Sequence, residues 1–161
     1  MLNVLTNTIM NIAKNNNTDS IDDRLDCHLM DLVVEFLQSN SEFYVPQEIG
    51  FCDFGRNLMG CYVPREKQVF VNIKLAMGMA RGIRCGNNKI LRQFISTMLH
   101  EHRHAWQYHT KQSMIYVDYE DGDNDYEAYY NHPMEVDARM AADKYLDKAM
   151  EYINNKLKAL L

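Results

Sequence analysis

The sequence contains no apolar run that approaches the roughly 18 consecutive residues needed to cross a bilayer as a helix. Its first residues, MLNVLTNTIMNIAKNNN, lack both the basic start and the small-residue cleavage site of a secretory signal peptide. Lys and Arg total 17 against 22 Asp and Glu, so the net charge of -5 argues against a general nucleic-acid binder. We therefore expect a cytoplasmic protein whose partners are small molecules, peptides or proteins, with neither membrane nor nucleic acid among them.

The four cysteines form no CxxC pair, and the chain is long enough to build a core without disulfide staples. We expect buried free thiols at Cys27, Cys52, Cys61 and Cys85. A length of 161 residues fits one domain, and 47% hydrophobic with 24% charged residues is typical of a globular fold. The sequence has no internal repeat, so we look for one functional site in a single domain, 1–161.

The N-terminal part of the chain has helical periodicity. Residues 1–18 predict a short helix and a linker, because apolar residues at helical intervals give way to a polar, turn-prone run. A second amphipathic helix follows over about 25–37, with Ser20 or Asp22 available as its cap and an end near Asn40.

The segment from Phe43 to Ile73 favours strands, with β-branched and aromatic residues among glycines and a proline. The piece GCYVPREKQVFVNI predicts an antiparallel hairpin that turns at Pro64 to Lys67 and carries Val69, Val71 and Ile73 on one face. A glycine-rich loop follows, then helices over about 89–110 and 133–158 that are joined by an acidic, Tyr-rich loop. The predicted fold class is α+β, with a short antiparallel sheet packed against helices and a functional core over 43–158.

The segment LHEHRHAWQYH contains His100, Glu101 and His104, which form an H-E-x-x-H motif inside a helical pattern. Positions i and i+4 of a helix lie on one face, so the two imidazoles can bind one metal ion with Glu101 beside them. At about 100° per residue, His102 falls on the apolar stripe instead, where a core or outer-shell histidine is expected. The apolar stripe consists of Leu91, Phe94, Ile95, Met98 and Ala105, and the histidine pair shares the opposite face with Gln93, Ser96, Thr97 and Gln107.

Catalytic zinc sites usually have three protein ligands and one place for water, so a third ligand is needed. Glu135 shares a helical stripe with Ala138 and Ala142, the small apolar residues of the last helix, where an unpaired carboxylate would be costly. We therefore predict that Glu135 is the third ligand, and that the two alanines let its helix approach the H-E-x-x-H helix closely. The alternative is that Glu135 only caps the helix that begins at Pro133.

Other side chains are candidates for supporting roles. His132 and His109 are reserve metal ligands. A donor for the developing oxyanion is expected among His132 and the tyrosines of the acidic loop, which are Tyr116, Tyr119, Tyr126, Tyr129 and Tyr130. The acidic run over 118–127 is typical of a solvated connection, or of a rim that prefers basic substrates.

H-E-x-x-H followed about thirty residues later by a helical glutamate resembles the gluzincin group of zincin metallopeptidases. The resemblance covers roughly residues 43–150 and implies a zincin-like fold, with a short sheet, an active-site helix and a C-terminal glutamate helix. Many gluzincins place an acidic residue four positions after the ligand glutamate to orient a histidine, but this sequence has Arg139 there. The SprT-like zincins, which use a third histidine, are therefore an alternative, with His132 as the nearest candidate.

The expected function is zinc-dependent peptide hydrolysis, with His100, His104 and Glu135 as zinc ligands and Glu101 as general base. Gln68 to Ile73 is a candidate edge strand for pairing with an extended substrate, and the alternative is a purely structural edge strand. The alternative function is a non-catalytic zincin that keeps zinc for stability and binds a protein partner.

Overall fold

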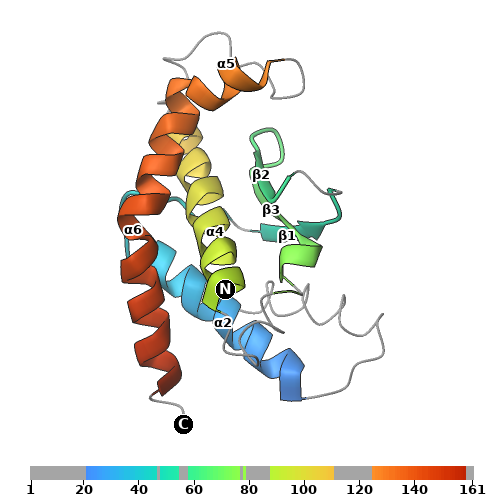
Figure 1. The fold of residues 1–161 in the computed structure, drawn as a ribbon, viewed down its shortest axis with the longest axis vertical. Coiled ribbons are helices and arrows are strands. Elements are labelled where there is room, and N and C mark those ends of the chain that lie inside the picture. Colours follow the sequence, from blue (N-terminus) through green and yellow to red (C-terminus); the bar gives the residue numbers. More distant parts are fainter. Residues whose placement is uncertain are drawn as a thin grey trace.

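The computed structural model describes residues 21–46, 48–54, 58–76, 78, 88–110 and 125–158. The predicted helix and linker over 1–18 lie outside this part of the chain, as do Ser20 and most of the acidic loop. The fold is α+β, with a small sheet on one side of a group of helices (Figure 1). Within the described residues no helix has the length and apolar character needed to cross a membrane.

Helix α2 (Ile21–Gln38) is the second amphipathic helix predicted from the sequence. Its apolar side chains are buried over the last three turns: Leu29, Leu32, Val33, Phe36 and Leu37. The helix ends because the Ser39 hydroxyl donates to the Phe36 carbonyl, and the Asn40 side chain then accepts the Glu42 N–H in a turn. The predicted end near Asn40 is confirmed. Asp22 lies inside the helix and is therefore not its cap.

The sheet consists of β1 (Glu48–Cys52), β2 (Gly60–Val63) and β3 (Gln68–Asn72) in the order β1-β3-β2. Strands β2 and β3 form the predicted hairpin, and Lys67 takes a left-handed φ of 52° in its turn. Strand β1, however, runs parallel to β3. The sheet is therefore mixed, and the prediction of a purely antiparallel sheet is wrong.

The position of β3 also corrects the prediction that Gln68 to Ile73 forms an edge strand. β3 pairs on both sides, and its Val69 and Val71 side chains belong to the hydrophobic core and are fully buried. The alternation ends at Asn72, whose side chain donates to the Leu58 carbonyl and accepts the Lys74 N–H. Ile73 is therefore the first residue of a helical turn rather than a third inward-facing strand residue.

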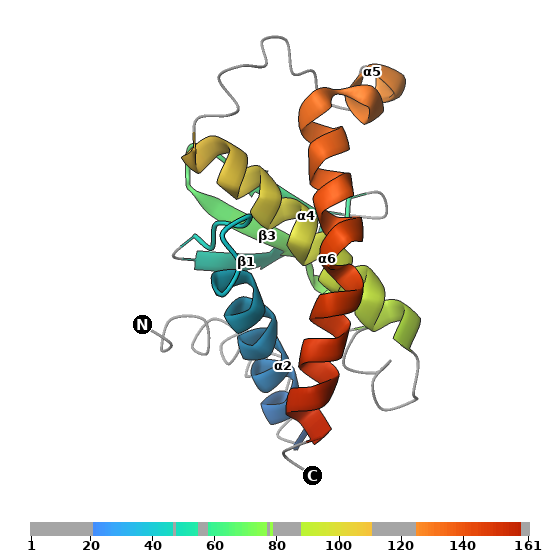
Figure 2. The same cartoon turned by 90° about the vertical axis from the view of Figure 1, so that its left-hand side faces the viewer.

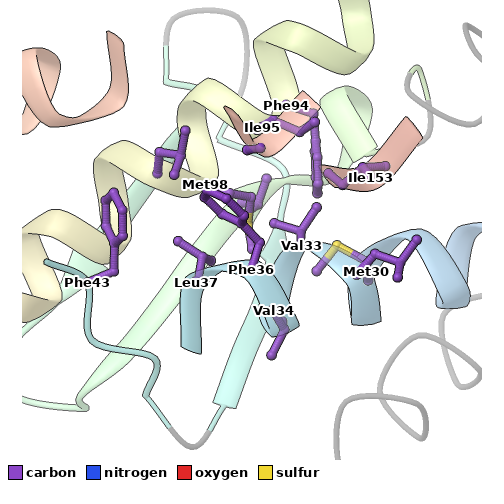
Figure 3. Close-up of a cluster of buried hydrophobic side chains, with 14 of the residues drawn as sticks. Met30, Val33, Val34, Phe36, Leu37, Phe43, Phe94, Ile95, Met98 and Ile153 are labelled. Atoms are coloured by element: carbon purple, nitrogen blue, oxygen red, sulfur yellow. The ribbon is translucent and has the colours of Figure 1, made fainter. Parts of the chain in front are cut away.

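Helices α4 (Asn88–His109) and α6 (Pro133–Lys158) match the two long helices predicted. Helix α4 lies between the sheet and α6, and α2 packs across both helices (Figures 1 and 2). The core fills the space where these helices meet, as the close-up of Phe94, Met98 and Ile153 with the α2 side chains shows (Figure 3). Because α4 contacts the sheet on one side and α6 on the other, its side chains can meet residues from both.

A short helix, α5 (Tyr126–Asn131), occupies part of the segment predicted to be a loop. The Asp125 carboxylate accepts the Ala128 N–H and so caps its first turn. The prediction missed α5 because its six residues, YEAYYN, carry no apolar periodicity; none of them is buried.

Candidate metal centre

Helix α4 places the two histidines of the H-E-x-x-H motif on one face, as their spacing predicts. The Nε2 atoms of His100 and His104 lie 3.0 Å apart, and the rings meet edge to face. The helix continues without interruption through this region because strong apolar contacts fix its opposite face: Leu91, Phe94, Ile95, Met98 and Ala105 are all buried. The predicted division of α4 into an apolar stripe and a polar, histidine-bearing face is confirmed.

Glu135 reaches the histidines from the first turn of α6. Its Oε2 lies 3.2 Å from His100 Nε2 and its Oε1 lies 3.1 Å from His104 Nε2. The two helices can approach closely because Ala138, Ala141 and Ala142, which follow Glu135, are small and buried. Glu135 is 1% exposed, so its carboxylate is held away from water and directed at two imidazoles. These three residues form the group among the described side chains that can hold a metal ion.

The donor set and its spacing fit zinc. Bonds of about 2.0 to 2.1 Å in a tetrahedral site place neighbouring ligand atoms about 3.3 to 3.4 Å apart. The two Nε2 atoms lie 3.0 Å apart here, and each lies 3.1 to 3.2 Å from a different oxygen of Glu135. Two imidazole nitrogens and one carboxylate are a ligand combination that catalytic zinc sites use. A buried carboxylate facing two ring nitrogens also needs a nearby positive charge, which either a metal ion or a protonated imidazole can supply. In the protein alone, burial lowers the pKa of His104, but the Glu135 hydrogen bond and the Glu101 and Glu135 charges outweigh burial and raise it.

Glu101 lies beside this group and is also buried, with 6% of its surface exposed. Burial raises the pKa of its carboxyl, the neighbouring charge of Glu135 adds to the rise, and His100 and His104 oppose it. The Tyr62 backbone N–H of β2 donates a hydrogen bond to the same carboxylate. Glu101 thus faces both the candidate ligands and the edge strand of the sheet, and its raised pKa suits a group that gives and takes a proton.

Gly60 allows β2 to lie directly against α4 at this point. A Cβ atom at Gly60 would lie 2.8 Å from Thr97 Cγ2 and 2.9 Å from Glu101 Cγ. Both separations are shorter than ordinary van der Waals contacts. The absence of a side chain at Gly60 therefore sets the distance between β2 and the Glu101 side chain.

A hydrogen-bond network contacts His104 at Nδ1, and most of this network was not predicted from the sequence. The Nδ1 atom of His104 lies 2.9 Å from Gln107 Oε1, and Gln107 Nε2 donates to the Met134 carbonyl and to Asp137 Oδ2. Asp137 in turn accepts two hydrogen bonds from Arg103. Burial alone raises the pKa of Asp137, but the hydrogen bonds from Arg103 and Gln107 outweigh it and lower the pKa. One feature pointed to Gln107: it lies three residues after His104 on the same helical face.

The reserve ligands lie outside the group of three. His132 Nδ1 accepts the Met134 N–H at the start of α6, so His132 caps the helix that carries Glu135. His109 stacks on Tyr44 at the end of α4, with 4.0 Å between ring centroids. Arg139 contacts the Tyr130 carbonyl and lies over the Tyr130 ring, in the position where many gluzincins have an acidic residue.

Tyr126, a candidate oxyanion donor, is 68% exposed and has ring contacts with Tyr129 and Tyr130 on its own helix. Tyr116 and Tyr119 lie outside the described residues. Within the described part of the chain, Cys52 and Cys61 are free thiols as expected, but neither is fully buried: Cys52 is exposed and Cys61 is half-buried. Burial, with Glu101 as the next contributor, raises the pKa of Cys61 to about 11.

His102 is a core histidine, one of the two roles expected for it. It is fully buried, its Nδ1–H donates to the Met98 carbonyl at 2.7 Å, and its Nε2 has no hydrogen-bond partner. Burial lowers its pKa to about 4. His102 therefore belongs to the hydrophobic core and not to the metal centre.

Comparison of the chain with protein-family models, with curated proteins and with solved structures found no match.

Proposed function

We propose that this protein is a zinc-dependent peptidase of a minimal, gluzincin-like zincin type. One observation carries the proposal: nitrogen atoms from His100 and His104 and the carboxylate of Glu135 lie within 3.0 to 3.2 Å of one another, beside the buried carboxylate of Glu101. A site that only stabilises the fold would not need a second buried carboxylate next to the ligands. Glu101 therefore favours catalysis over a purely structural role.

Each residue has a role that follows from its position. His100, His104 and Glu135 would hold zinc, which supplies a Lewis acid that polarises a peptide carbonyl and makes water more acidic. Glu101 accepts the proton of the attacking water and delivers it to the leaving amine. The Tyr62 N–H keeps the Glu101 carboxylate oriented between these two transfers.

The sheet offers a surface on which an extended peptide can lie. β2 is an edge strand of the sheet, and it is the strand that contacts Glu101 through Gly60 and Tyr62. Main-chain pairing along an edge strand binds an extended chain with little dependence on its sequence. We therefore assign substrate binding to β2, in place of the central strand β3.

The proposal is tested by Glu101→Gln, which keeps the size of the side chain and removes its ability to take a proton. The variant should retain about one zinc per chain but lose hydrolysis of unfolded polypeptide, by a factor on the order of 10² or more. Glu151→Gln is the matched control, because Glu151 is an exposed carboxylate on α6. Zinc content is measured by elemental analysis and hydrolysis with fluorescently labelled casein.

Equal hydrolysis by the wild type and Glu101→Gln would refute the assigned mechanism. Zinc binding by the wild type without hydrolysis of any peptide pool would favour the alternative, a non-catalytic zinc-binding module. Absence of zinc binding would refute both.

A further inference from the structure

We propose that Gln107 is a positioning residue that fixes the ring of His104 for metal binding, acting as a neutral link between His104 and the Asp137 carboxylate. This inference rests on the proposed zinc site and adds to it the groups that orient one of its ligands. A ligand histidine normally donates its second N–H to a carboxylate, a carbonyl or water. Here a glutamine side chain accepts that N–H.

The contacts of Gln107 determine which way its amide points. Its Nε2 lies 3.1 Å from the Met134 carbonyl and 2.7 Å from Asp137 Oδ2, and both of these atoms only accept hydrogen bonds. The atom that faces His104 Nδ1 at 2.9 Å must therefore be the amide oxygen. An oxygen acceptor there requires a proton on Nδ1, which leaves Nε2 as the atom that can bind a metal.

Hydrogen bonds from Arg103 hold the Asp137 carboxylate in place, so the group that orients the Gln107 amide is itself fixed. Arg103 donates from Nε to Asp137 Oδ2 at 2.7 Å and from Nη2 to Oδ1 at 3.0 Å, a two-point contact that fixes the carboxylate plane. Arg103 also donates to the Glu42 carbonyl at 2.9 Å and lies over the Trp106 ring. The loop after α2 and helices α4 and α6 thus all contact the group that orients His104.

This arrangement also explains how the centre is supported without an acidic residue four positions after Glu135. Arg139, at that position, contacts Tyr130 on α5. Asp137 lies two positions after Glu135, and Gln107 spans the remaining distance to His104. The carboxylate therefore acts on His104 through an amide and not by direct contact.

The test is Gln107→Leu, which keeps a similar buried volume but removes the acceptor. We expect zinc to bind 10- to 100-fold more weakly, measured by competition with a chromophoric chelator. The matched control is Gln93→Leu, because Gln93 is an exposed glutamine on the same helix, seven residues before His100. Asp137→Asn provides a second variant, which removes the charge but keeps an acceptor, and it should weaken zinc binding less than Gln107→Leu does.

A second measurement reports on the hydrogen bond itself and needs no metal. In the metal-free wild type and in Gln93→Leu, the Nδ1–H proton of His104 should give a slowly exchanging signal in ¹H–¹⁵N spectra. This signal should be lost in Gln107→Leu. An unchanged signal, or unchanged zinc affinity in Gln107→Leu, would overturn the positioning role. If the wild type binds no zinc, the proposed function fails, while the metal-free spectra still decide whether Gln107 orients His104.

Discussion

Gly60→Ala is the substitution that tests most sharply how β2 and α4 together hold the Glu101 side chain. The added methyl group would lie 2.8 Å from Thr97 Cγ2, 2.9 Å from Glu101 Cγ and 3.1 Å from the Phe70 carbonyl oxygen. Carbon atoms pack at about 3.5 to 4.0 Å, so β2 and α4 must separate by roughly 0.5 to 1 Å. The Phe70 oxygen belongs to the backbone of β3 and cannot turn aside as a side chain can.

Two consequences of Gly60→Ala follow, with different magnitudes. Overpacking of this kind costs about 1 to 3 kcal/mol in the free energy of unfolding. Displacement of a catalytic group by about 1 Å can lower kcat on the order of 10². Because Glu101 is not one of the proposed zinc ligands, zinc affinity should change much less than kcat. Urea unfolding, casein hydrolysis and chelator competition measure the three quantities separately.

Gly50→Ala is the matched control for this prediction. A methyl group at Gly50 would lie 2.6 Å from two atoms of the Phe70 ring, which is a side chain next to β1 and not part of the centre. It should lower stability without a selective loss of kcat. The double variant Gly60→Ala with Thr97→Ser removes one of the close contacts but leaves the one with Glu101, so it should recover stability more than kcat. If Gly60→Ala has wild-type stability and wild-type kcat, the assigned contact between β2 and Glu101 is wrong.

Two further predictions concern the core and the helix interface. The folded protein holds His102 neutral with a pKa of about 4, whereas the unfolded chain takes up a proton near pH 6.5, so unfolding becomes easier as the pH falls from 6.5 toward 4. In metal-free protein this protonation lowers the free energy of unfolding by roughly 3 kcal/mol over that pH range. Acid unfolding curves should show that His102→Leu abolishes this pH-dependent loss of stability, whereas the exposed-site change His109→Gln retains it. Ala138→Leu should push α6 from α4, lowering stability by about 1 to 3 kcal/mol and weakening zinc binding through Glu135. The exposed-site change Met140→Leu on the same helix should do neither, and equal zinc affinity in both variants would contradict this prediction.

Periodicity predicted the elements that carry the candidate centre. Helices α4 and α6 are each more than twenty residues long and bury a stripe that recurs at helical spacing, so their type and approximate bounds could be read from the sequence. The same projection placed His100 and His104 on one face and identified Glu135 as an acidic residue on an otherwise apolar one. The structure brings these three side chains together.

Features that depend on which elements become neighbours could not be predicted in this way. Nothing local distinguishes a strand that pairs in parallel from one that pairs antiparallel, so the place of β1 beside β3 was missed. Asp137 resembles any solvent-facing acid on a helix until Arg103 and Gln107 from α4 are placed against it. The prediction that β3 is an edge strand was wrong for the same reason, because β3 lies between β1 and β2.

The measurement closest to the central claim is the zinc affinity of the wild type against that of Glu135→Gln. The variant keeps the shape of the side chain but replaces a carboxylate that is 1% exposed with a neutral amide. Titration of metal-free protein should show about one tightly bound zinc per chain in the wild type and at least 100-fold weaker binding in the variant. Equal affinity in the two proteins, or no zinc bound by the wild type, would contradict the assignment of these three side chains as a metal centre.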